Sequence, residues 1–232
     1  MDQVLARVTD FLERGDRPHS VFAVNPEKNF SVPKDSLLYD TFKTADLLIP
    51  DGIGVVLAAR LLHGIKLQRL PGVELMDNIC ALSARNGHTI FIFGAREDVN
   101  QTAVDVLQKR YPRLVIAGRS HGYVKEEEME DLVKGINTSG AEILFLALGS
   151  PKQEKWFAVH KESLHNIRIC QGIGGTLDTI AGKVRRAPKI WRRCHAEWLY
   201  RLIIDPKRIR RQKLLPVFAA MVILSTLKRL DS

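Results

Sequence analysis

A single aspartate, Asp51, stands where a predicted strand meets a predicted helix in the stretch ADLLIPDGIGVVLAARLLHG, residues 45–64. The apolar run at 47–49 is typical of a buried strand, and from residue 55 apolar side chains recur at helical spacing. Asp51 either caps the helix that starts near Ile53 or takes a proton from a bound hydroxyl group, as a general base does. The polar turn at Arg69 and Gly72 follows soon after and favours the second interpretation.

A second candidate site is the segment SPKQE at residues 150–154. Serine, proline and glutamine at these spacings are typical of a capping box, which would make Ser150 the N-cap of a helix. The alternative is that the start of this helix and Lys152 face an anionic ligand, while Gln153 and Glu154 hydrogen-bond sugar or base hydroxyls.

A third candidate is the glycine group Gly172, Gly174 and Gly175, which suits close approach of the backbone to a diphosphate. A dinucleotide fingerprint needs another glycine where Leu177 stands, so a nucleotide-linked oxidoreductase is disfavoured. The chain contains no Walker A sequence, no histidines at metal-ligand spacing and no Asp-x-Asp pair, so we expect neither a metal nor a cofactor. The negative charge of a leaving diphosphate would then be met by arginine, lysine and helix N-termini.

These residues need a scaffold of alternating strands and helices. Apolar runs predict strands at 21–24, 46–49, 89–93, 114–117, 142–148 and 167–171, and helical spacing predicts helices near 34–44, 54–63, 72–86, 97–110, 125–137 and 152–162. The pattern predicts an α/β, Rossmann-like fold with a mainly parallel sheet and helices on both faces. Ligands bind at the carboxyl ends of such strands. The junction residues there are the candidate ligand contacts: Asn25, Glu27, Asp51, Gly52, Gly94, Gly149, Pro151 and the residues that follow them in the two later segments.

The positive charge is concentrated near the C-terminus. Residues 183–213 hold twelve lysines and arginines against two acids, a net 12 − 2 = +10, so the rest of the chain carries 9 − 10 = −1. Beyond it, the apolar stretch 214–227 is shorter than the ~20 residues that span a bilayer. We expect a core at 1–195 and a basic, amphipathic helical appendage at 196–232 that lies on an anionic membrane surface.

Two further expectations come from composition. The basic segment alternates with Trp191, Trp198 and leucines, which favours lipid over the alternative of a nucleic-acid-binding module. Three scattered cysteines and no signal sequence indicate a reduced, cytoplasmic setting, and an apolar tail makes a homo-oligomer an open possibility.

Taken in order, VNPEKNF, ADLLIPDGIGVVLAARLLHG, RLPGVELM, FIFGA, LFLALGSPKQEKW, GIGGTLDTIAGKVRRAP and EWLYRLIIDPKRIRRQ resemble the WecG/TagA/CpsF family of bacterial glycosyltransferases over nearly the whole chain. The resemblance implies an inverting, metal-independent transfer of N-acetylmannosamine or a related sugar. The donor would be a UDP-sugar and the acceptor a polyprenyl-diphosphate-linked saccharide, at the inner face of the cytoplasmic membrane.

The resemblance also implies roles for individual residues. Asp51 matches the family's proposed general base. Asn25 and Glu27 match its first loop, and Pro151, Gln153 and Glu154 its Pro-x-Gln-Glu motif. The C-terminal arginines that are proposed to neutralise diphosphate correspond to Arg208, Arg210 and Arg211.

One residue departs from the family pattern. Ala23 stands where many members have threonine, so a hydroxyl contact to the sugar or acceptor is missing. This leaves UDP-glucose, used in exopolysaccharide synthesis, as an alternative donor.

Overall fold

The computed structural model describes residues 1–194, 196–204, 206 and 209–230. Its centre is a six-stranded sheet in which every pairing is parallel, in the order β2-β1-β6-β5-β3-β4. The strands are β1 (His19–Val24), β2 (Leu47–Pro50), β3 (Thr89–Gly94), β4 (Val115–Ser120), β5 (Ile143–Ala147) and β6 (Ile169–Gly172). All six match predicted strands, and the α/β fold is confirmed.

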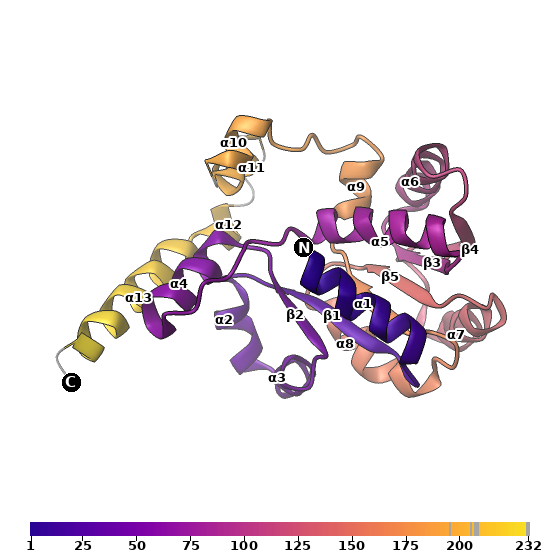
Figure 1. Cartoon of the computed structure of the whole chain (residues 1–232), viewed down its shortest axis with the longest axis horizontal. Helices are drawn as coiled ribbons and strands as arrows, with labels where there is room; N and C mark the ends of the chain where they lie inside the picture. The colour runs from indigo at the N-terminus through magenta and orange to yellow at the C-terminus, as the bar shows by residue number, and fades with distance from the viewer. Residues whose placement is uncertain (195, 205, 207–208, 231–232) are drawn as a thin grey trace.

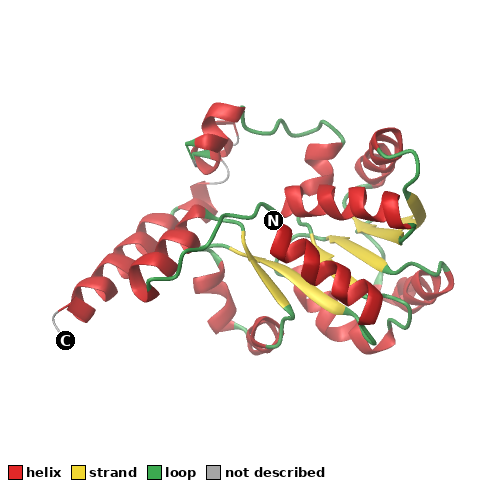
Figure 2. Ribbon diagram, viewed as in Figure 1, coloured by secondary structure: helices red, strands yellow, loops and turns green. Residues whose placement is uncertain are grey.

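Helices cover both faces of the sheet (Figures 1 and 2). In chain order they are α1 (Asp2–Arg14), α2 (Lys28–Ser31), η1 (Val32–Lys34), α3 (Ser36–Lys43), α4 (Ile53–His63), α5 (Gly72–Asn86), α6 (Glu97–Arg110), η2 (Glu126–Glu128), α7 (Met129–Thr138), α8 (Lys152–His160), η3 (Lys161–Ser163), α9 (Thr176–Ile180), α10 (Lys189–Arg193), α11 (Glu197–Ile204), α12 (Ile209–Gln212) and α13 (Leu214–Leu230).

Alternation along the strands divides the core into two clusters. Ile90 and Ile92 of β3 face the helices α1, α5, α6 and α9, while Phe91 and Phe93 face α3, α7 and α8. The central strands β3 and β5 are buried on both faces, so their sequences read as continuous apolar runs.

The two clusters also locate a crevice. β1 and β6 are neighbours, but the helix α3 that follows β1 lies on one face and the helix α9 that follows β6 lies on the other. Ligands of open α/β sheets bind where the connections of adjacent strands leave in opposite directions. The loops after β1 and β6 therefore flank the expected binding edge.

The C-terminal segment continues as helices after β6 and α9. α13 runs alongside α4, and the two project from the sheet together (Figure 1). In the described part of the chain, no helix combines the length and apolar character needed to cross a bilayer.

At the amino end of the sheet, Asp46 joins the start of β2 to the start of β1. Its carboxylate accepts hydrogen bonds from Arg17 at 2.6 Å and from the Ser20 backbone N–H at 2.9 Å, and it lies 3.2 Å from His19 Nδ1. Burial alone would raise the pKa of Asp46, but these hydrogen bonds outweigh it and lower the pKa to about 2.

We expect Asp46→Asn to lower the free energy of unfolding at pH 7 by roughly 1–2 kcal/mol, a value reduced for solvent screening of Arg17. Because the folded pKa lies below the unfolded one, this stabilisation is present above about pH 5 and is lost as the pH falls toward 2. Urea unfolding at several pH values between 2 and 7 measures the difference in free energy of unfolding between the variant and the unmodified protein. Asp10→Asn, at an exposed ion pair with Arg7, is the control. An Asp46 effect that did not diminish in acid would contradict the prediction.

Candidate active site

Asp51 lies just after the carboxyl end of β2, beside the loop that follows β1. Its backbone N–H donates to the Val24 carbonyl at 3.1 Å, and its own carbonyl accepts from Arg69 Nε at 2.7 Å. The N-cap position of α4 is Gly52, one residue after the Asp51 that the capping interpretation placed there. The backbone on both sides of the carboxylate is therefore fixed by contacts outside α4.

Two glycines allow the loops after β1 and β2 to touch. A Cβ at Gly52 would lie 3.1 Å from Pro26 Cδ, and one at Gly54 would lie 2.8 Å from Pro26 Cγ. The Asn25-Pro26 turn thus packs directly on the turn that carries Asp51. Asn25 itself is half-buried, and its Oδ1 accepts from the Lys28 backbone N–H at 3.3 Å.

A buried ion pair joins the segment after β1 to α8. Lys28 Nζ lies 2.7 Å from Glu154 Oε1, with side-chain exposures of 8% and 1%. The same ammonium donates to Ser150 Oγ and lies 4.7 Å from the centre of the Phe42 ring. Because a buried charge is costly unless it is paired and hydrogen-bonded, these contacts hold the loops after β1 and β5 in one arrangement.

Gln153 extends the connection to the loop after β6. Its Oε1 accepts from the Gly174 backbone N–H at 3.0 Å, and a Cβ at Gly172 would lie 2.5 Å from its Nε2. The capping-box prediction is wrong, because the N-cap of α8 is Pro151 and no side chain caps it. Ser150 and Gln153 instead bind neighbouring loops.

The turn of Asp51 is also joined to the C-terminal helices. Arg69, which holds the Asp51 carbonyl, donates to Glu197 Oε2 at 2.7 Å. Both side chains of this ion pair are largely buried, at 15% and 6% exposure. Glu197 is the first residue of α11, so a residue of the predicted appendage supports the turn that carries the candidate base.

The remaining predicted residues line the same edge. Gly94 ends β3 with a φ of +128°, and a Cβ there would lie 2.4 Å from the Ala147 carbonyl carbon. The Gly72 carbonyl accepts from Gln171 Nε2 at 3.1 Å. Glu27 and Gly149 are half-buried, and the exposed residues are Pro151, Lys152 and Gly175.

The structure brings the loops of Asp51, Asn25, Gln153 and Gly174 together and leaves part of the prediction open. Arg208 lies outside the described residues, as do the side chains of Arg210 and Arg211, whose backbone belongs to α12. The contacts of these candidates with a substrate remain predictions.

Lys28 and Glu197 were not predicted. Their partners are 126 and 128 residues away in the sequence, and a lone lysine or glutamate carries no local signal of such a pairing. Lys28 stands between Glu27 and Asn29, so its immediate neighbours give no hint that it is buried.

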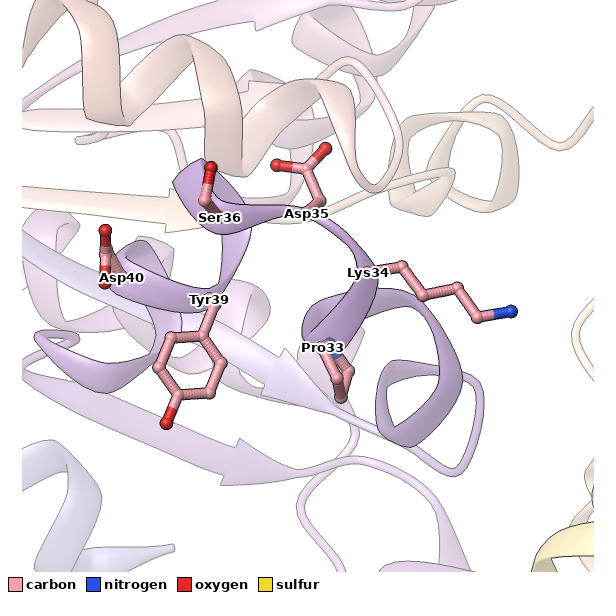
Figure 3. A pocket seen from close by; sticks show the side chains of 6 residues that line it. All are labelled: Pro33, Lys34, Asp35, Ser36, Tyr39 and Asp40. Atoms are coloured by element: carbon pink, nitrogen blue, oxygen red, sulfur yellow. The ribbon is translucent and has the colours of Figure 1, made fainter.

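A separate hollow of about 560 Å³ lies over η1 and the start of α3 (Figure 3). Asp35 in this hollow caps α3 by accepting from the Leu38 N–H at 3.0 Å and also pairs with Lys155. None of its lining residues is a predicted site residue. Over the described ranges, no three acid, histidine or cysteine side chains are grouped as a metal site.

Replacing Gly54 tests the contact between the loops after β1 and β2. Alanine favours an ordinary helix by about 1 kcal/mol over glycine, and Gly135→Ala in α7, where a Cβ meets nothing within 4 Å, is expected to stabilise accordingly. Gly54→Ala should instead destabilise by about 1–3 kcal/mol, because its Cβ meets the rigid Pro26 ring. Urea unfolding of both variants decides, and equal gains would contradict the contact.

Replacing Glu197 tests the connection to α11. We expect Glu197→Gln to lower the free energy of unfolding by about 1–3 kcal/mol, because the largely buried Arg69 guanidinium loses its ionic partner. Asp98→Asn removes an exposed carboxylate from Arg96 and should change stability by less than about 0.5 kcal/mol. Indistinguishable urea midpoints for the two variants would exclude the supporting role of Glu197.

Comparison with known proteins identifies the family of the chain. The model of the glycosyl transferase WecG/TagA/CpsF family matches residues 1–232. Among curated relatives are N-acetylglucosaminyldiphosphoundecaprenol N-acetyl-beta-D-mannosaminyltransferases of Staphylococcus aureus strains MRSA252 and NCTC 8325 / PS 47. Each is 36% identical over 199 residues, which cover 85% of this chain and 77% of the relative. The chain therefore belongs to the WecG/TagA/CpsF family of glycosyltransferases, as its motifs predicted.

Proposed function

We propose that this glycosyltransferase moves a sugar from a UDP donor to a polyprenyl-diphosphate-linked saccharide with inversion at the anomeric carbon. The observation that carries the proposal is the location of Asp51 at a strand end beside the crevice between β1 and β6, with its backbone held on both sides. The names of the relatives support the acceptor, which in those proteins is an N-acetylglucosaminyl diphosphoundecaprenol.

In the proposed reaction, the Asp51 carboxylate accepts the proton of an acceptor hydroxyl. The hydroxyl oxygen bonds to the anomeric carbon of the donor, while the bond from that carbon to the UDP oxygen breaks and UDP leaves from the opposite face. One displacement inverts the anomeric centre and needs no protein nucleophile.

We propose that the charge of the departing diphosphate is met by protein groups without a metal ion. The backbone N–H groups at the start of α8, Lys152 beside them and the arginines at 208, 210 and 211 have the required charge. Gln153 and Glu154 lie at the same helix start, but both are buried and bind Gly174 and Lys28, so their contact with sugar hydroxyls stays a prediction.

The donor is N-acetylmannosamine-bearing by analogy with the relatives. UDP-glucose remains the second candidate, because Ala23 on β1 offers no hydroxyl where many family members have threonine. The two donors differ at C2, so a donor panel distinguishes them.

We further propose that the protein binds the inner face of the cytoplasmic membrane. The C-terminal helices leave large apolar side chains exposed, among them Trp198, Ile203, Leu224 and Leu227. Basic residues accompany them in the sequence, and this combination favours an anionic bilayer surface.

The decisive test is UDP release by the full-length protein in detergent. The donors offered are UDP-N-acetylmannosamine, UDP-N-acetylglucosamine, UDP-glucose and UDP-mannosaminuronate, with a short polyprenyl-diphosphate saccharide as acceptor. We expect Asp51→Asn to keep the fold and lower turnover by about 10²–10⁴-fold, the contribution typical of a general base. Asp40→Asn, an exposed acid on α3, is the control. Retained turnover in Asp51→Asn would refute the assignment of the base.

A further inference from the structure

A groove of about 630 Å³ lies along α4, next to the turn of Asp51. One face of α4 forms its floor, the loop after α4 forms a side, and the residue that follows α10 closes it. The side chains that matter here are Ile53, Leu57, Arg60, Lys66, Leu67 and Cys194.

We propose that this groove binds the prenyl diphosphate part of the acceptor, with the diphosphate between Arg60 and Lys66 and the first isoprenyl units against Leu57 and Leu67. The proposal rests on the transferase function proposed above. It assigns a binding site to the prenyl diphosphate part of the acceptor, for which the loops around Asp51 provide none.

The first argument is the exposed apolar surface. α4 is a strongly apolar helix, yet of its side chains only Ala58 is buried, and Leu57 and Leu67 in the groove are 50% and 41% exposed. α13 covers one side of α4, through Phe218 beside Gly54 and a hydrogen bond from Arg229 to the Leu62 carbonyl. The groove side stays open among the described residues, and burying a leucine side chain there would favour the binding of an apolar chain.

The second argument is charge. Arg60 and Lys66 are both exposed, and neither forms an ion pair within the described residues. Among the described residues, no aspartate or glutamate lines the groove. Two cations above an apolar floor complement an amphiphile whose headgroup carries several negative charges, and a diphosphate offers oxygen acceptors to both.

The third argument is distance. Arg60 follows Ile53 by seven residues, which is about 10 Å along a helix, and Ile53 follows Asp51 by two. In the acceptor that names the relatives, one N-acetylglucosaminyl residue separates the reacting end from the diphosphate. A single hexose is shorter than this interval, so the long Arg60 side chain, which a helix directs toward its N-terminus, must reach back for a hydroxyl at Asp51 and a diphosphate at Arg60 to fit one ligand.

The thiol of Cys194 in the groove can be used to detect binding. Of the three cysteines, Cys194 is exposed, while Cys80 and Cys170 are buried. Burial raises the pKa of the Cys80 thiol to about 12 and that of Cys170 well above its usual value, so neither reacts readily with maleimides. Maleimide labelling of the unmodified full-length protein therefore reports on Cys194, and peptide mass spectrometry verifies the site.

The experiment measures the labelling rate in detergent with geranylgeranyl diphosphate, geranylgeraniol or inorganic diphosphate, without any sugar donor. At about ten times its Kd, geranylgeranyl diphosphate should slow labelling about tenfold, because only the free protein reacts. The alcohol and inorganic diphosphate, each with half of the recognition chemistry, should protect much less. The double variant Arg60→Gln/Lys66→Gln should bind geranylgeranyl diphosphate about tenfold or more weakly, since both charge-assisted contacts are lost.

Arg85→Gln is the matched control, because Arg85 is an exposed arginine in the last turn of α5. It should retain full protection. In turnover assays the double variant should raise KM for the acceptor and leave KM for the donor unchanged.

Three results would overturn the proposal: no protection by geranylgeranyl diphosphate, equal protection by geranylgeraniol or, in a parallel run without detergent, by phosphatidylglycerol vesicles, or labelling that slows with protein concentration alone. Equal protection by vesicles would mean that the groove binds the bilayer surface. Slower labelling at higher protein concentration would mean that it binds another copy of the chain. Because protection needs no turnover, a protein that is protected but inactive with every donor would refute the proposed function and leave the groove assignment intact.

Discussion

The arrangement of the candidate active site depends on the buried ion pair between Lys28 and Glu154. A lysine and a glutamate that leave water together cost several kcal/mol each unless their geometry is good, so the loops that carry them have little freedom to separate. Ser150 and the Phe42 ring complete the shell of the ammonium. Glu154 Oε2 is buried and has no hydrogen-bond partner among the described residues.

Around this pair the edge is built from contacts between loops. Gln153 reaches the loop after β6, Pro26 packs on Gly52 and Gly54, and Asp51 bonds to the end of β1. Loops have weak local preferences of their own, and these contacts replace them with a fixed arrangement. A general base needs that fixity, because proton transfer requires hydrogen-bond distance to the hydroxyl.

The strands, the parallel sheet and the strand-end location of Asp51 could all be predicted from the sequence. They follow from local patterns: apolar runs, helical spacing and the rule that parallel strands end at one edge. The prediction that Ser150 and Gln153 form a capping box was wrong, because it considered only residues close in the sequence. Their local spacing favours a cap, whereas Lys28 and Gly174, distant in sequence, offer the partners that they bind in the fold.

The pair of Arg69 and Glu197 could not be predicted, because its members belong to segments with unrelated patterns. The pair also has a thermodynamic consequence. Coupling between two sites is reciprocal, so whatever fixes the turn of Asp51 strengthens the seating of α11, and whatever displaces α11 loosens that turn. A ligand or surface that binds the C-terminal helices and moves α11 would therefore change the position of Asp51, although the two segments are far apart in the sequence.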